Sequence, residues 1–341
     1  MVDEASKASN VAAAALLLLT AVLSIIIFLC SLCLARRRKD PTRSWLALYK
    51  VAFGCFVLST ILIFFNYLLT AWYTQLNGAA PVRANASSVV SNTLSAQVET
   101  GIVGPLFDEF AVTFALVALL GLAVAVSLAQ AGKDSAVDRI LLLGGYGLAA
   151  VLGILSVVAF ALSEREYTIA RGNPELRADA DLASTAWDLL RYSRNVTFFM
   201  LAIRLVFNIA VLVKSILVAV KTKSEPRVTT ATRYLLVCCA LLLLKTSYDV
   251  GYFARYVPLG DPQSAPAQPG ACDAILDVVL NVWPMFIAFV ILFALGVKKQ
   301  QGGLWATEQP IVVVHLAGEG MLPHQATRDF EYLNPEPQEL P

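Results

Sequence analysis

Seven long apolar stretches run through the chain, and this pattern constrains its fold more than any other feature. A helix needs about 20 apolar residues to span the hydrocarbon core of a bilayer. Every stretch reaches that length, so we expect an all-α fold, a seven-helix transmembrane bundle. The predicted spans are residues 11–35, 45–72, 106–131, 140–162, 196–220, 234–257 and 274–297.

The composition agrees with a membrane protein. Hydrophobic residues make up 57% of the chain and charged residues 15%, whereas soluble domains average about 45–50% and about 25%. The formal net charge of +1 does not indicate a nucleic-acid partner. We expect the partners to be membrane lipid and a small hydrophobic substrate or ligand, with no nucleic acid.

A basic block predicts the orientation of the chain. Residues 36–39 read Arg-Arg-Arg-Lys and directly follow the first apolar stretch. Lys and Arg accumulate in cytosolic loops, so the N-terminus is expected outside or in the lumen and the C-terminus in the cytosol. The expected organisation is a short luminal N-terminus (1–10), the transmembrane domain (11–299) and a mobile cytosolic tail (300–341). The 163–194 loop, with several arginines on the predicted outer side, is an exception to the charge rule.

Two other local features concern modification. Asn85 begins an Asn-Ala-Ser acceptor pattern for N-glycosylation, in a loop predicted to be luminal. Cys30 and Cys33 lie near the basic block, where a thiol can be acylated. We expect them instead to be buried, inert thiols.

Polar residues follow helical spacing inside several spans. In the sixth span, Lys245, Tyr248, Asp249 and Tyr252 recur at three- and four-residue steps and therefore share one helix face. Ionisable residues inside membrane spans are rare and mark functional sites. Polar residues also occur in four other spans: Asn66, Asp108 with Glu109, Arg204 with Asn208, and Asp277 with Asn281, with Trp283 just beyond.

With alternating chain direction, these groups fall between the middle of the bilayer and its outer surface. Five helices are therefore expected to contribute to one polar pocket open to the lumen or exterior. A purely structural role is the alternative. Lys245 and Asp249 are spaced for an ion pair within one helix, and Arg204 is expected to pair with Asp249 or Asp277.

Other features have a packing role or exclude known chemistries. Gly145, Ala149 and Gly153 share one face of the fourth span, which allows close helix approach. Both histidines lie in the tail, so no intramembrane histidine metal site is expected. The seventh span contains no lysine to attach retinal. We expect no metal and no cofactor.

The span layout resembles that of fungal heptahelical membrane proteins. The shared features are a short outer N-terminus, spans rich in small residues, the Tyr-Asp-Val-Gly-Tyr-Phe stretch at 248–253 and a Pro-containing polar tail. Some such proteins are membrane-bound terpene cyclases of meroterpenoid or indole-diterpene pathways. The resemblance covers the layout and includes no diagnostic motif. It implies a metal-independent enzyme of secondary metabolism that cyclises an (epoxy)prenylated substrate.

Acid-initiated cyclisation requires a protonated carboxyl, an apolar cavity and aromatic faces that stabilise carbocations. The candidate acids are Asp108, Glu109, Asp249 and Asp277, of which Asp249 is weaker because Lys245 favours its ionised form. The expected substrate-binding residues are Asn66, Arg204, Asn208, Lys245, Tyr248, Tyr252, Asn281 and Trp283.

Two other functions remain open. Seven spans with the N-terminus outside are typical of heptahelical receptors, which would bind a small ligand in the same cavity. A transporter or an accessory membrane protein is the third hypothesis. In each case the expected location is the endoplasmic reticulum or the plasma membrane, with several membrane crossings.

Overall fold

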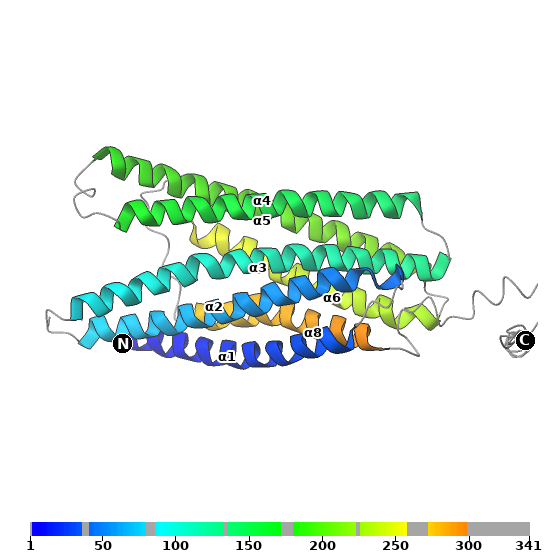
Figure 1. The fold of residues 1–341 in the computed structure, drawn as a ribbon, viewed down its shortest axis with the longest axis horizontal. Coiled ribbons are helices and arrows are strands. Elements are labelled where there is room, and N and C mark those ends of the chain that lie inside the picture. The colour runs from blue at the N-terminus through cyan, green and yellow to red at the C-terminus, as the bar shows by residue number, and fades with distance from the viewer. Residues whose placement is uncertain are drawn as a thin grey trace, which may run out of the picture. The chain divides into compact units, whose positions relative to one another are not determined.

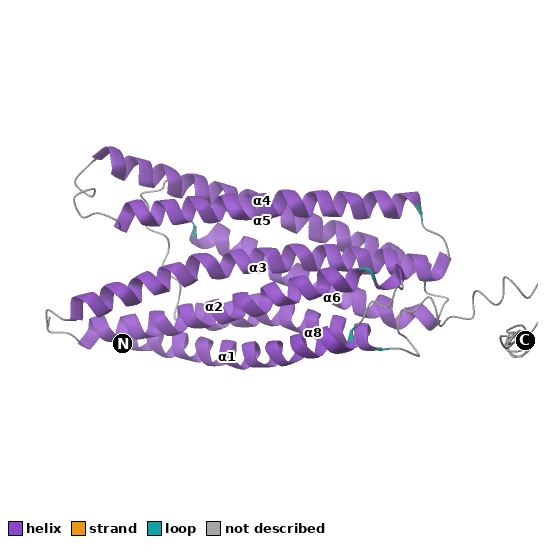
Figure 2. Cartoon of the chain, in the orientation of Figure 1, coloured by secondary structure: helices purple, strands orange, loops and turns teal. Residues whose placement is uncertain are grey.

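A computed structural model describes residues 2–35, 41–79, 86–131, 135–171, 180–222, 226–257 and 272–298. Within these ranges the secondary structure is helical, with no strand (Figures 1 and 2). Seven helical segments are long and apolar enough to cross a membrane. The prediction of an all-α, multi-pass membrane protein with seven spans is confirmed.

The first six segments are single long helices, and the seventh consists of three consecutive parts. A short 3-10 turn, η1 (Pro41–Arg43), precedes the second helix. The six helices are α1 (Val2–Leu34), α2 (Trp45–Ala79), α3 (Ala86–Ala131), α4 (Ala136–Arg171), α5 (Ala180–Lys221) and α6 (Pro226–Tyr256). The seventh segment contains α7 (Asp273–Asp277), a π-helical turn η3 (Val278–Val282) and α8 (Trp283–Val297).

The helices extend well beyond the predicted spans. Much of the predicted 73–105 and 163–194 loops is helical, and α1 already begins at Val2. Hydropathy detects only residues apolar enough for lipid, whereas backbone hydrogen bonds continue the helix through more polar sequence. Asn85 and the predicted tail from 300 onward lie outside the described residues.

Helix α3 is the central helix. It contacts α2, α4, α5 and α6, and Figure 1 shows it between α2 and the α4–α5 pair. Of its most apolar 18-residue window 78% is buried, against 22–44% for the other six spans. The remaining helices therefore expose much of their apolar surface, as expected for helices that face lipid.

Close approach of α3 and α4 depends on Gly145. A Cβ added there would lie 2.6 Å from Leu120 Cδ2, whereas one added at the neighbouring Gly144 would meet nothing within 4 Å. Ala149, one turn beyond Gly145, is also buried. The predicted packing role of this face is confirmed.

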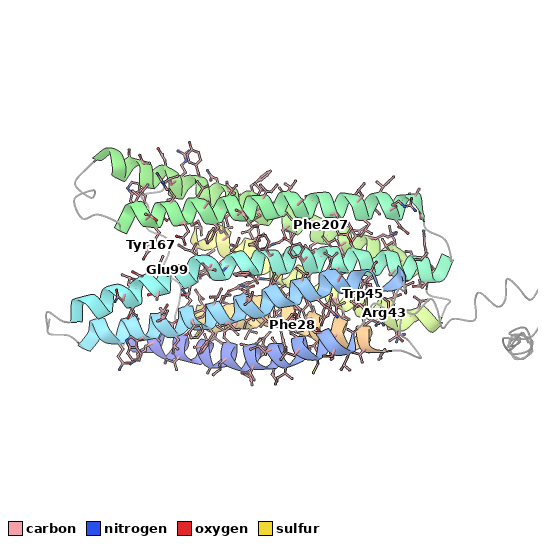
Figure 3. All side chains as sticks on the ribbon, in the orientation of Figure 1. Phe28, Arg43, Trp45, Glu99, Tyr167 and Phe207 are labelled. Carbon is pink, nitrogen blue, oxygen red and sulfur yellow. The ribbon has the colours of Figure 1, made fainter. Side chains whose placement is uncertain are left out.

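An aromatic core lies towards the end of the bundle where α1 ends and α2 begins. The rings of Phe53 in α2 and Phe289 in α8 stack with centroids 4.9 Å apart. Arg43, labelled with Trp45 at this end in Figure 3, is buried and donates to the Gly296 carbonyl oxygen. The end of α8 is thereby tied to the start of α2.

Two helix irregularities lie close to the polar residues of the bundle. Pro105 lies inside α3, where it removes one backbone donor and favours a local bend. The π-helical turn η3 precedes Pro284 in the seventh segment. Single π turns inside helices are frequent at functional sites. Asp108 follows Pro105 by one turn, and Asn281 lies within η3.

Candidate functional site

Buried and half-buried ionisable side chains from four membrane segments form one connected cluster, which we call the charge network. Arg204 of α5 is 1% exposed and donates to carboxylates on two other helices. Its Nη1 lies 2.5 Å from Glu109 Oε2 of α3, and its Nη2 lies 2.9 Å from Asp249 Oδ2 of α6. The planar guanidinium presents its donors in a fork, which suits a bridge between two acids.

Lys245 of α6 is the second cation of the network and is fully buried. Its Nζ lies 2.9 Å from Asp108 Oδ2 and 3.4 Å from Asp249 Oδ2. It also donates to Asn281 Oδ1 in η3. Lys245 therefore connects α3, α6 and the seventh segment, and the two cations share Asp249.

Asp277 enters the network through neutral partners. Asn281 Nδ2 donates to Asp277 Oδ1 at 3.1 Å, and the Tyr67 hydroxyl of α2 donates to Oδ2 at 3.1 Å. Among the ion pairs of the described residues, none involves Asp277. It is the one carboxyl of the network without a cationic partner in that part of the chain.

The network has more acids than bases. It contains two basic groups, Arg204 and Lys245, and four acids, Asp108, Glu109, Asp249 and Asp277. If all six groups were ionised, the formal charge of the network would be −2. Uncompensated charge is costly in a membrane interior. Additional positive charge, as a proton or as a basic group of a ligand, would stabilise this arrangement.

A pocket of about 250 Å³ lies between α3, α4 and α5 and reaches the network at Glu109. Glu109 is the one ionisable residue in its lining. The other lining residues are mostly apolar or carry hydroxyl groups: Gly101, Ile102, Pro105, Leu106, Ser156, Ala159, Phe160, Ser163, Thr197 and Met200. An apolar pocket with one charged group in its lining is typical of a ligand-binding site.

Several predicted site residues lie beside the network rather than within it. Asn208 Nδ2 donates to Thr246 Oγ1, 3.1 Å away between α5 and α6. Tyr248 and Tyr252 pair on α6, with ring centroids 5.9 Å apart. Trp283 packs against the hydrophobic core.

Asn66 has a different environment from the other predicted site residues. Its Nδ2 donates to the Gln97 carbonyl oxygen at 2.8 Å, and so joins α2 to α3. A Cβ at Gly101 would lie 2.8 Å from this nitrogen, so Asn66 also occupies the space that the glycine leaves. These contacts give Asn66 a role in helix packing.

Sequence reasoning missed Tyr67, which connects α2 to Asp277. A hydroxyl-bearing residue next to Asn66 in an apolar span was the available signal, but aromatic residues in spans are commonly packing residues. It also missed the pair at the other end of α4 and α5, where Lys214 Nζ lies 2.5 Å from Asp138 Oδ1. Asp138 lies at the start of an apolar span, so nothing in the local pattern identified its partner.

Two buried polar atoms near the network lack partners among the described residues. They are Arg204 Nε and Asn208 Oδ1, which lie one helical turn apart on α5. An unpartnered buried polar atom costs about 1–3 kcal/mol. In the described ranges no group of three or more His, Cys, Asp or Glu is placed to hold a metal ion.

Comparisons with protein-family models, with curated proteins and with solved structures find no match for this chain.

Proposed function

We propose that this multi-pass membrane protein binds a small, largely apolar molecule between α3, α4 and α5. Glu109 would recognise a hydrogen-bond donor or a positive charge on that molecule. The observation that carries the proposal is the position of Glu109, which lines the pocket and also belongs to the charge network. Arg204 contacts Oε2 of this carboxylate, which leaves Oε1 for a ligand.

The size of the pocket supports a small ligand. Its volume of about 250 Å³ lies just below the range of roughly 300–1,000 Å³ for sites of drug-sized molecules. A prenylated polycyclic substrate would have to extend out of it between the helices. The apolar lining favours a molecule that partitions into the membrane and carries few polar groups.

The shared cation supports a receptor-like response. Glu109 and Asp249 both bind Arg204. A cationic ligand at Glu109 would therefore weaken the contact of Arg204 with Glu109 and strengthen its contact with Asp249. A ligand shifts a conformational equilibrium only through a difference in its affinity for the two states. Because the Arg204 bridge joins α5 to α6, a ligand that alters the bridge would have different affinities for two arrangements of these helices.

Chemical analysis of the purified protein tests this proposal. The wild type and the variants Glu109→Gln, Ser156→Phe and Val157→Phe would be purified and their organic extracts compared by mass spectrometry. Ser156 lines the pocket, whereas Val157 is exposed on the same helix and is the matched control. We expect a co-purifying molecule in the wild type and Val157→Phe, lost in Ser156→Phe and reduced in Glu109→Gln. Identical extracts from all four proteins would contradict the proposal.

Acid-initiated cyclisation is a second candidate, favoured by Asp277. Asp108, Glu109 and Asp249 each form an ion pair with Arg204 or Lys245. Asp277 has neutral partners, and Tyr248, Tyr252 and Tyr256 form a ladder of rings on α6. Such rings can stabilise carbocations.

Incubation of microsomes with epoxy-prenyl substrates tests the second candidate. Asp277→Asn should abolish product formation, because an amide cannot donate the initiating proton. The exposed Asp188 of α5 provides a matched control, and Asp188→Asn should retain full turnover. Equal turnover in both variants would exclude Asp277 as the acid. For either function, we place the N-terminus outside and the protein in the endoplasmic reticulum or plasma membrane.

A further inference from the structure

Cys30 and Cys33 lie in the last turns of α1 and are both exposed. The expectation that these two thiols are buried is therefore wrong. Residues three apart share a helix face, so the two sulfur atoms point to the same side of α1. The neighbouring Ser31 is buried, which distinguishes the packed side of the helix from the side that carries the cysteines.

An apolar strip continues from the cysteines along the outer side of α1. Ile26, Leu23 and Leu19 are exposed by 53%, 41% and 58% and recur at three- and four-residue steps. Side chains on a helix tilt towards its N-terminus. A hydrocarbon chain attached at Cys30 or Cys33 would therefore be directed back along this strip. At 1.5 Å per residue, the strip from Leu19 to Cys33 measures roughly 21 Å.

The sequence after α1 places the two sulfur atoms at the membrane boundary. α1 ends at Leu34, and the basic residues 36–39 follow. Lys and Arg at this position favour the cytosolic side and attract anionic lipid headgroups. Two outward thiols in the last apolar turns before a basic block are typical of membrane proteins that carry fatty acids on cysteine.

We propose that Cys30 and Cys33 are S-acylated by long-chain fatty acids taken from acyl-coenzyme A. The cysteine sulfur attacks the thioester carbonyl carbon, and a new carbon–sulfur bond forms to Sγ. The bond to the coenzyme A sulfur breaks, and the released thiolate takes up the proton lost by the cysteine. No oxidation or reduction is involved. The proposal is independent of the pocket and depends on the proposed cytosolic position of residues 36–39.

Replacement of acyl groups by a maleimide mass tag tests the proposal on the full-length protein. Free thiols in membranes from a eukaryotic host are first blocked. Thioesters are then cleaved with hydroxylamine, and the thiols that this step releases are tagged. The variants are Cys30→Ser, Cys33→Ser, the double variant, and Cys272→Ser as a control for an exposed cysteine at the opposite end of the bundle. Samples without hydroxylamine show the background.

We expect two hydroxylamine-dependent tags in the wild type and in Cys272→Ser, one in each single variant at α1, and none in the double variant. The double variant should express and unfold like the wild type, since both side chains are exposed. An untagged wild type would overturn the proposal, whatever the orientation of the chain. Tags that persist in the double variant would overturn the assignment to these two cysteines.

Discussion

The ammonium group of Lys245 lies 2.9 Å from the carboxylate of Asp108, although the two residues are 137 positions apart in the chain. Lys245 is fully buried, and Asp108 is 18% exposed. A lysine in this position is stable only with its acidic partners, because the cost of an unpaired buried charge is high. This contact joins α3 to α6 at the centre of the bundle.

Removal of the cation at 245 should destabilise the protein strongly. Lys245→Met leaves Asp108 and Asp249 without this partner, and breaking a buried ion pair costs about 3–5 kcal/mol. The apparent melting temperature of the purified protein in detergent measures the loss. The exposed Lys221 offers a control, and Lys221→Met should unfold at the wild-type temperature. Adding Asp108→Asn to Lys245→Met should recover part of the stability, and no recovery would contradict the pairing.

Arg204 should not be replaceable by lysine. A single ammonium group cannot reproduce the bridge from Nη1 to Glu109 and from Nη2 to Asp249. We expect Arg204→Lys to lose about 1.5–3 kcal/mol, the contribution of one hydrogen bond to a charged group. Lys214→Arg is the comparison, since Lys214 pairs with one acid, Asp138, among the residues that the structure describes, and thermal unfolding should show little change there. Equal losses at both positions would argue against a bridging role.

The four network acids should differ in their contribution to stability. Asp249→Asn weakens contacts with both cations, whereas Asp277→Asn alters hydrogen bonds with Tyr67 and Asn281. Asp277→Asn should therefore unfold closer to the wild-type temperature than Asp249→Asn. Tyr67→Phe removes one hydrogen bond to the Asp277 carboxyl group and should cost about 1–3 kcal/mol. The reverse order for the two aspartates would show that Asp277 has a charged partner.

Gly145 and Gly144 should respond differently to the same substitution. Gly145→Ala adds a methyl group 2.6 Å from Leu120 Cδ2 and should cost about 1–3 kcal/mol through overpacking. Gly144→Ala adds it to open space, where alanine is the better helix former by about 1 kcal/mol. Thermal unfolding of the two variants gives the comparison. A stabilising Gly145→Ala would mean that α3 and α4 separate at no cost.

The orientation of the chain can be measured at Asn85. If the N-terminus is outside, the wild type should carry a glycan that an endoglycosidase removes, and Asn85→Gln should migrate like the deglycosylated protein. A cysteine placed at position 37 should react with a membrane-impermeant maleimide only after the cells are opened. Reaction at 37 in intact cells would reverse the proposed orientation.

Part of the site could be predicted from the chain because the constraint is local. Lys245 and Asp249 are four residues apart, and helical spacing alone predicts their contact, found at 3.4 Å. The sequence predicts Asp249 or Asp277 as the partner of Arg204, and the structure shows Asp249 together with Glu109, which was not predicted as a partner. The partners of Arg204 depend on how the helices that carry these residues are rotated about their own axes. No local sequence pattern specifies those rotations.

The number and helical nature of the spans were determined by the sequence alone, whereas the full lengths of the helices were not. In a bilayer the backbone must satisfy its own hydrogen bonds, so an apolar stretch of sufficient length has one available conformation. The contact of Tyr67 with Asp277, the pocket beside Glu109 and the exposure of Cys30 were decided only by tertiary structure. Each depends on which side of a helix faces a neighbour, and in lipid that choice is governed by side-chain packing and polar contacts between helices distant in sequence.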